Sequence, residues 1–208
     1  MAEFKHHSSL QVIDGDLYTI TNNATLIREV LQFEPSSEHV IIVSYYASGT
    51  HWMQQMCQLV LHGGRSAATH GEFWNRSPFL EDSGIRVTEV TSSPRLLTTH
   101  LRPGKITMNG SAKYVYVCRK PWDVCVSLYD FLRQMPVSPL EISFDEFVDM
   151  FLDGRLPVPE YFGHVYAGFL LRNEPNVFFV TYEEITKDTR GVVVRLANFL
   201  GEQYRKRN

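Results

Sequence analysis

The chain has 208 residues, of which 44% are hydrophobic and 21% are charged, and its formal net charge is -3. These are ordinary values for a globular protein, and we expect a single domain over residues 1–208. Because the acidic balance gives no general attraction to nucleic acids, we expect no nucleic-acid partner. Any anionic ligand would have to be held by local basic groups.

Cysteine usage and the N-terminus bear on the compartment. Cys57, Cys118 and Cys125 each lie in an apolar pattern, and their spacing matches neither a C-x-x-C pair nor a set of metal ligands. An odd number of such residues is typical of buried, reduced thiols in a cytosolic protein. Residues 1–10 are polar, and no stretch approaches about 18 continuous apolar residues. We therefore expect a cytoplasmic protein with neither a signal peptide nor a membrane span.

The N-terminal part predicts a turn and then a helix. Asp14-Gly15 is a turn signal between two short extended pieces within residues 12–20. Asn22 or Asn23 can cap a helix over residues 24–33, in which apolar side chains recur at helical spacing.

Residues 39–52 are the most informative stretch. A β-branched run at residues 40–43 is typical of a buried parallel strand, and Ser48-Gly49-Thr50 follows at once. An apolar stripe then continues as a helix to Leu61. A strand that turns through small residues into a helix leaves free backbone N–H groups, which form an anion site with the helix dipole. An ordinary strand-to-helix turn has equal weight on these residues alone.

Strands and helices alternate through the rest of the chain. Residues 63–82 are predicted to be irregular, an aromatic loop that could wall a pocket. Later strands are predicted at Arg95–Thr99, Lys113–Cys118 and Val177–Thr181. Later helices are predicted over residues 121–133, 143–154, 160–172 and 192–200. In the helix over residues 160–172, we expect Val165, Phe169 and Leu170 to face inward.

This alternation predicts an α/β fold, a parallel sheet flanked by helices on both faces. Ligands of such sheets bind beyond the carboxyl ends of the strands. The residues at or just past those ends are the loop at 48–51, His100, Arg119 and Tyr182.

Residues 45–52, Y-Y-A-S-G-T-H-W, resemble the phosphosulfate loop of cytosolic sulfotransferases, Y-P-K-S-G-T-x-W. Tyr46 stands in place of the family's proline, and Ala47 in place of its lysine. The resemblance implies a P-loop-containing nucleotide-hydrolase-like sulfotransferase fold. The nucleotide-kinase pattern G-x-x-x-x-G-K-[ST] is not met, which argues against the related P-loop kinases. Residues 77–81, S-P-F-L-E, are similar to the family's substrate-side P-F-L-E segment.

His100 ends the segment P-R-L-L-T-T-H, which resembles the family's P-R-L-x-K-T-H-L. The resemblance implies that His100 is the general base for the acceptor hydroxyl, a task that the ordinary pKa of histidine suits. A surface or half-buried histidine without a role is the plain alternative. Thr98 stands in place of a second family lysine.

The predicted donor-binding residues also follow from the resemblance. The run from Tyr116 to Ser127 is similar to the family's Y-x-x-R-x-x-x-D-x-x-x-S, which implies that Arg119 and Ser127 hold the nucleotide's 3′-phosphate. Tyr182 and Trp52 are implied to lie against the adenine, although either could be plain core packing. The remaining predicted donor-binding residues are those of the loop, Ser48, Gly49, Thr50, His51 and Trp52.

The predicted function is transfer of a sulfuryl group from 3′-phosphoadenylyl sulfate (PAPS) to a hydroxyl or amine of a small, hydrophobic acceptor. The products include the 3′,5′-bisphosphate nucleotide PAP, and no metal is required. The alternative is a nucleotide-binding protein that has lost the chemistry, because Ala47 and Thr98 both lack a positive charge. The family's C-terminal R-K-G-x-x-G-D-W segment and dimer segment have no match at residues 205–208, so the oligomeric state stays open.

His51 has two readings. It is expected in the first turn of the loop helix, where a solvent-facing side chain without a role is the commoner case. The helix N-terminus is expected to favour the neutral form of His51, because a positive charge is disfavoured there. A neutral imidazole can also donate one hydrogen bond to a phosphate or sulfuryl oxygen, so His51 could partly replace the missing lysine.

Overall fold

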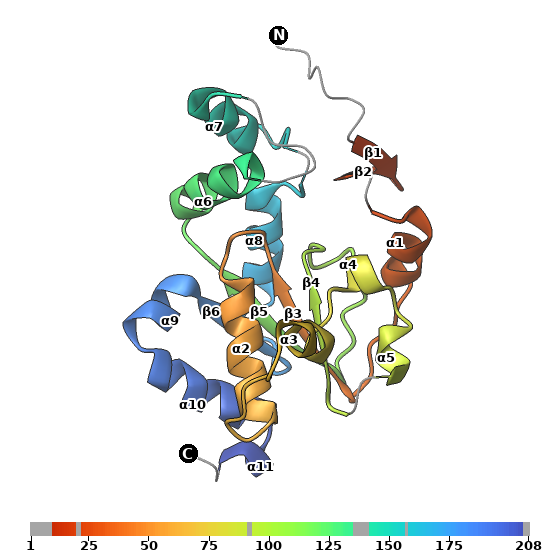
Figure 1. The fold of residues 1–208 in the computed structure, drawn as a ribbon, viewed down its shortest axis with the longest axis vertical. Coiled ribbons are helices and arrows are strands. Elements are labelled where there is room, and N and C mark those ends of the chain that lie inside the picture. The colour runs from red at the N-terminus through yellow and green to blue at the C-terminus, as the bar shows by residue number, and fades with distance from the viewer. Residues whose placement is uncertain (1–9, 20–21, 91–92, 135–141, 157, 206–208) are drawn as a thin grey trace.

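The computed structural model describes residues 10–19, 22–90, 93–134, 142–156 and 158–205. Within these ranges the centre of the fold is a parallel sheet of four strands in the order β4-β3-β5-β6 (Figure 1). The strands are β3 (His39–Ser44), β4 (Arg95–Thr99), β5 (Lys113–Cys118) and β6 (Val177–Thr181). A small antiparallel hairpin, β1 (Leu10–Ile13) and β2 (Asp16–Thr19), turns at Asp14 and Gly15. All six strands overlap segments that the sequence predicted to be extended, although β1 begins at Leu10, before the predicted segment of residues 12–20.

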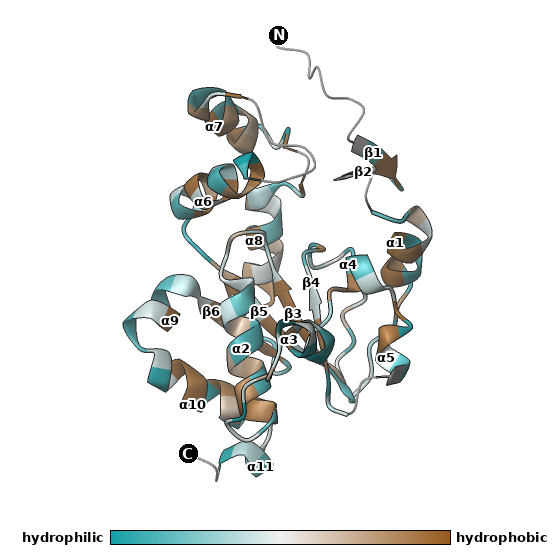
Figure 2. Ribbon diagram, viewed as in Figure 1, coloured by the Kyte–Doolittle hydropathy of each residue, from teal (hydrophilic) through white to brown (hydrophobic). Residues whose placement is uncertain are grey.

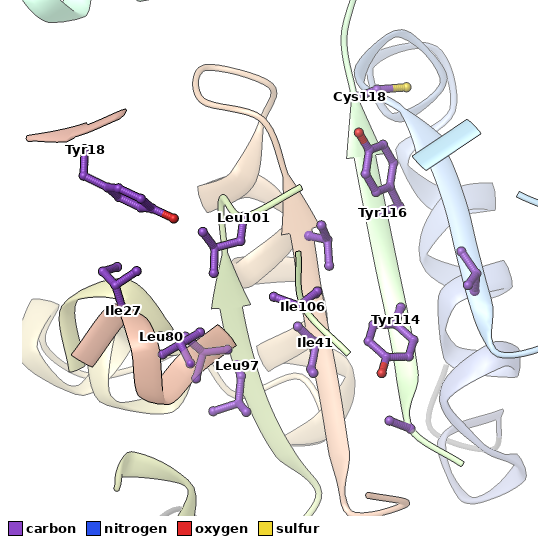
Figure 3. Packing of buried hydrophobic residues seen from close by; sticks show 14 of the residues in the cluster. Tyr18, Ile27, Ile41, Leu80, Leu97, Leu101, Ile106, Tyr114, Tyr116 and Cys118 are labelled. Atoms are coloured by element: carbon purple, nitrogen blue, oxygen red, sulfur yellow. The ribbon is translucent and has the colours of Figure 1, made fainter. Parts of the chain in front are cut away.

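Helices cover both faces of this sheet, as predicted. Side chains of β3 alternate between two cores: Ile41 and Val43 pack on one face, while Val40 and Ile42 pack on the other. The first core also takes side chains from α1 (Ala24–Leu31) and α4 (Leu80–Ser83), and Figure 3 shows part of it around Ile41 and Leu97. The second takes side chains from α2 (Thr50–Leu61) and α10 (Thr189–Leu200). With both faces covered, brown hydrophobic stretches run along β3 and β5 in the middle of the sheet, whereas β4 is paler (Figure 2).

Seven further helices lie around these elements in the part of the chain that the structure describes. They are α3 (His70–Arg76), α5 (Val87–Val90), α6 (Pro121–Arg133), α7 (Phe144–Leu152), α8 (Tyr161–Leu170), α9 (Tyr182–Lys187) and α11 (Glu202–Arg205). The predicted capping box is present at α7, where Ser143 and Glu146 satisfy each other's backbone N–H groups. None of the helices described combines the length and the apolar character that a bilayer span needs.

The prediction of irregular structure over residues 63–82 was wrong. The segment contains α3 and the start of α4, and the Thr69 side chain caps α3 by accepting a hydrogen bond from the Glu72 N–H. The last long helix was predicted to begin at residue 192, but α10 begins at Thr189, where the Asp188 side chain caps it.

The predicted inward face of α8 was also wrong in part. Phe169 and Leu170 are 45% and 58% exposed, whereas His164 and Gly168 are buried. A β-carbon at Gly168 would lie 2.1 Å from the Tyr116 ring, so glycine allows the helix to pack directly on β5. The Tyr116 hydroxyl lies 2.7 Å from Nδ1 of His164, which makes a polar side chain part of this contact.

Candidate functional site

The parallel register brings four chain segments together at one edge of the sheet. The loop at residues 45–49 follows β3, His100 follows β4, Arg119 follows β5 and Tyr182 follows β6. This is the edge at which ligands of open α/β sheets bind.

The loop after β3 presents backbone donors. Gly49 has φ 97°, a left-handed conformation, and it offers no side chain to cap α2. The first N–H groups of α2 therefore face the mouth of the loop without intrahelical partners. A β-carbon at Gly49 would lie 2.7 Å from the Tyr182 ring, so glycine is needed for space as well as for conformation. Ala47 also has a positive φ, 55°.

The hydroxyl groups of the loop are turned inward. Ser48 Oγ donates to the Tyr46 carbonyl at 3.4 Å, and Thr50 Oγ1 lies 2.8 Å from the buried Ser44 Oγ. Both Ser48 and Thr50 are buried. Their predicted contribution to anion binding therefore rests mainly on their backbone N–H groups.

Arg119 and Ser127 meet at the end of β5. Arg119 Nη1 donates to Ser127 Oγ at 3.0 Å and to the Ala47 carbonyl at 3.1 Å. The guanidinium also stacks 4.5 Å from the centre of the Tyr182 ring. Arg119 Nε is buried and has no hydrogen-bond partner in the part of the chain that the structure describes. A buried donor without a partner is uncommon, and an anionic oxygen would satisfy it.

Trp52 and Tyr182 form one side of the site. Their ring centres are 5.5 Å apart at an interplanar angle of 72°. Trp52 also packs on the core between the sheet and α10. Both predicted roles of Trp52, core packing and an aromatic wall, are compatible with this position.

His100 is held in a single orientation by its surroundings. Nδ1 lies 2.7 Å from the Ser44 carbonyl, which can only accept, so Nδ1 carries the proton and Nε2 has the lone pair. The ring packs against both Tyr46 and Phe79, with ring centres at 4.1 Å and 5.0 Å. Burial lowers the pKa of His100 to about 4, with a smaller lowering from His51, against the raising effect of the Ser44 hydrogen bond. The imidazole is therefore neutral at physiological pH and able to accept a proton at Nε2.

Glu81 supports the segment that carries His100. Its Oε1 accepts hydrogen bonds from the Thr99 hydroxyl at 2.9 Å and from the His100 backbone N–H at 2.5 Å. Burial raises the pKa of Glu81 to about 7 in spite of these hydrogen bonds.

His51 is exposed in the first turn of α2, yet its ring takes part in a hydrogen bond. Its Nδ1 lies 2.8 Å from Gln54 Oε1, and its ring meets the Trp74 ring edge-on at 5.1 Å. Gln54 in turn contacts Thr98, whose side chain is completely buried.

The structure thus brings all the predicted site residues to one edge of the sheet. Sequence reasoning missed four residues that hold them there, namely Ser44, Tyr46, Gln54 and Glu81. Glu81 lay within the matched S-P-F-L-E segment, but nothing in the pattern marked the amide of Gln54, which lies in the middle of a helix.

A parallel α/β sheet with a glycine-containing loop, an unpaired arginine donor and a neutral histidine at the same edge is typical of group-transfer and nucleotide-binding proteins. Residues 37–207 match the family model described as "Sulfotransferase domain". The chain belongs to the sulfotransferase family.

Relatives with curated descriptions agree with this assignment. The chain is 30% identical to Sulfotransferase 1E1 of Cavia porcellus, over 82% of this chain and 61% of the relative. It is 32% identical to a 3-alpha-hydroxysteroid sulfotransferase of Cavia porcellus, over 86% of this chain and 64% of the relative. An amine sulfotransferase of Oryctolagus cuniculus is 30% identical over 84% of this chain and 60% of the relative. The chain therefore spans less than two thirds of the length of these relatives.

Solved structures share the fold. The mouse sulfotransferase SULT7A1 complexed with PAP superimposes with a TM-score of 0.76 at 23% identity, covering 94% of this chain and 71% of that one. A retinol dehydratase in a complex with retinol and PAP gives a TM-score of 0.71 at 22% identity, covering 90% of this chain and 66% of that one. At these identities the comparison establishes the fold.

Proposed function

We propose that the protein transfers a sulfuryl group from PAPS to a hydroxyl or amine of a small, hydrophobic acceptor. The observation that carries the proposal is the state of His100. Its Nδ1–H is tied to the Ser44 carbonyl, which leaves Nε2 as a base at the same sheet edge as the anion loop.

The chemistry at His100 balances in a single step. Nε2 takes the proton of the acceptor hydroxyl while the acceptor oxygen forms a bond to sulfur. The bond between sulfur and the 5′-phosphate oxygen breaks, and its electron pair stays with that oxygen. PAPS supplies the sulfuryl group, and PAP is the product that remains.

The donor site fits an adenosine bisphosphate. The unpaired Nε of Arg119 and the adjacent Ser127 hydroxyl suit the 3′-phosphate, and the N–H groups of the loop suit the 5′-phosphosulfate. Trp52 and Tyr182 offer aromatic surface to the adenine. These roles for Ser48, Gly49, Thr50, His51, Trp52, Arg119, Ser127 and Tyr182 are part of the proposal.

The acceptor side is aromatic. Tyr46 and Phe79 both pack against the His100 ring, and the ring centres of Trp74 and Phe79 are 5.8 Å apart. Such walls suit a hydrophobic acceptor with one polar group. Relatives described as hydroxysteroid and amine sulfotransferases suggest these two acceptor classes.

A second function has an observation in its favour. Ala47 cannot supply a cation, and Thr98 is directed into a buried network with Gln54 and Ser77. For a reaction that depends on electrostatic stabilisation, each lost contact can cost roughly 10²–10³ in rate. The alternative is a protein that binds PAP or PAPS without transferring the sulfuryl group.

Two measurements separate these functions. Purified protein with labelled PAPS and a panel of phenols, steroids and amines should yield labelled product, and calorimetry should show PAP binding. Binding of PAP without any transfer supports the non-catalytic alternative. Absence of both contradicts the proposed function, and binding of ATP in preference to PAP would revive the P-loop kinase reading.

Two further proposals accompany the function. We propose that the family domain extends through the chain as one unit, as the two shared cores on the central sheet suggest. We also propose a cytosolic location, which three buried free thiols fit.

A further inference from the structure

Gln54 has one possible amide orientation. Its Nε2 donates to the Ser77 carbonyl at 2.8 Å and to Thr98 Oγ1 at 2.9 Å. Thr98 Oγ1 in turn donates to the same Ser77 carbonyl at 3.1 Å. Because a carbonyl only accepts, the Ser77 contact fixes the NH₂ group on this side and leaves Oε1 facing His51. All three residues of this network are completely buried.

This orientation determines the tautomer of His51. Gln54 Oε1 accepts at 2.8 Å, so the proton on His51 must be on Nδ1. The neutral ring then carries only a lone pair at Nε2, which repels an anionic oxygen. Its one N–H is already in use, so the neutral ring cannot also donate to a phosphate or sulfuryl group. Only the doubly protonated ring can donate from Nε2.

The surroundings of His51 favour an anion and leave the ring accessible. His51 is exposed, it lies in the first turn of α2 beside the N–H groups at Thr50, and that turn contains no acidic residue. Edge contacts with Trp74 and Phe79 hold the ring on the side of His100.

The charged and titratable groups around His51 are engaged elsewhere. On α3, Glu72 pairs with Arg76, and the His70 ring accepts from the Trp74 indole. From α4, Glu81 bonds to Thr99 and His100, and beyond β5 Arg119 bonds to Ser127. His100 lies close enough for His51 to act on it electrostatically. Within the described part of the chain, no carboxylate forms a hydrogen bond with His51.

We propose that His51, positioned by Gln54, is the cation that this loop offers to the sulfuryl donor, and that donor binding therefore takes up a proton at Nε2 of His51. This proposal rests on the proposed function. The family's lysine, in whose place Ala47 stands, carries a permanent charge. In this chain a charge on His51 that depends on pH takes its place. The two histidines then act in opposite states, His51 doubly protonated and His100 neutral.

The test is the number of protons taken up when PAP binds. Calorimetric titrations at one pH in two buffers of different ionisation enthalpy give that number directly, and the pH dependence of Kd gives it independently. PAP phosphates also titrate, so the informative quantity is the difference between the parent and His51→Asn. His62→Asn, at the other end of α2, is the matched control.

The expected result is a higher proton uptake in the parent than in His51→Asn. The parent's Kd should weaken more steeply with rising pH, by up to about tenfold per pH unit for one linked proton. His62→Asn should behave as the parent. Gln54→Leu should reduce the uptake, because it frees the His51 ring while Thr98 keeps its bond to Ser77.

Equal proton uptake and equal pH dependence in the parent and in His51→Asn would overturn the proposal. If a folded Gln54→Leu variant takes up as many protons on PAP binding as the parent, Gln54 does not position His51. If the parent fails to bind PAP at any pH, the proposed function is contradicted instead, so the two failures are distinguishable.

Discussion

Arg119 and Ser127 stand eight positions apart in the chain, and their side chains meet through a hydrogen bond of 3.0 Å. The contact exists because α6 begins at Pro121 and presents its second turn to the end of β5. It holds the guanidinium beside Tyr182 with Nε unpaired.

Arg119→Ala should weaken PAP binding by roughly 10- to 150-fold, which corresponds to about 1.5–3 kcal/mol for a hydrogen bond to a charged group. Ser127→Ala should weaken it by roughly 2- to 10-fold, because a neutral donor is lost and Arg119 is less well held. Isothermal titration calorimetry measures both, with the exposed Arg190→Ala as control. Affinity equal to that of the control would place Arg119 outside the site.

His100→Ala should lower turnover by roughly 10²–10⁴-fold and leave the PAP affinity nearly unchanged, because the base acts on the acceptor. The pKa of about 4 for His100 means that this base stays neutral as pH falls from 8 towards 5. The acid limb of kcat/KM caused by His100 should therefore lie near pH 4. An acid limb near pH 6.5 that disappears in His100→Ala would contradict this environment.

Stability should depend on pH through two opposing groups. The folded-state pKa of Glu81 is raised to about 7 from 4.5, so its contribution is fully present below pH 4.5 and is lost as pH rises through 7. The folded-state pKa of His100 is lowered to about 4 from 6.5, so stability is lost as pH falls from 6.5 towards 4.

Glu81→Gln should remove the first of these effects. Urea unfolding of the variant should show a free energy of unfolding that no longer declines between pH 5 and 8, a gain on the order of 1–3 kcal/mol at the alkaline end. The decrease in the free energy of unfolding that His100 causes at low pH should then stand out more clearly in the profile of the variant. The same pH profile in parent and variant would mean that Glu81 does not titrate in this range.

Ala47→Lys should raise turnover, by up to about 10²-fold if one electrostatic contact is regained. The positive φ of 55° is tolerated by alanine, and lysine makes the same demand on the backbone. His51→Asn should matter much less in the Ala47→Lys background than in the parent. Steady-state kinetics of the parent, both single variants and the double variant under saturating donor measure this. No gain from Ala47→Lys and no loss from His51→Asn would favour the non-catalytic alternative.

Gly49→Ala should destabilise the fold by at least about 1 kcal/mol, because φ is 97° and the new β-carbon would meet Tyr182 at 2.7 Å. Displacement of Tyr182 should also weaken PAP binding. Gly110→Ala is the control, since its β-carbon would enter open space. Equal unfolding midpoints and equal PAP affinities for the two variants would contradict this reading of the loop.

Most of the fold followed from periodicity and turn chemistry. The central strands are continuous apolar runs, and α7 carries a complete capping box, so local signals and tertiary structure agree there. Helix α3 was missed although Thr69 and Glu72 have capping-box spacing. The face of α8 was misjudged because its contact with β5 is made by Gly168 and His164, which hydropathy does not mark as core.

The site was predictable where one residue type performs one task. Arg119 and His100 follow strands, and topology brings strand ends together. The supporting contacts were not predictable, because they join positions far apart in the chain. Gln54 and Thr98 are 44 residues apart, and only the folded structure shows that the Gln54 amide donates a hydrogen bond to the Thr98 hydroxyl.

Ala47 and Thr98 both stand in place of a family lysine. Because of the network of Gln54, Thr98 and Ser77, a lysine is harder to restore at residue 98 than at residue 47. At residue 47 a lysine can be introduced alone, because the alanine side chain, which packs at the edge of a hydrophobic cluster, holds no hydrogen-bonded group in place. At residue 98 a lone lysine would bring a long cationic side chain into a fully buried position and deprive the Gln54 amide of an acceptor. A lysine at residue 98 therefore requires a compensating change at Gln54. Residues 54 and 98 must be changed together, whereas residue 47 can be changed alone.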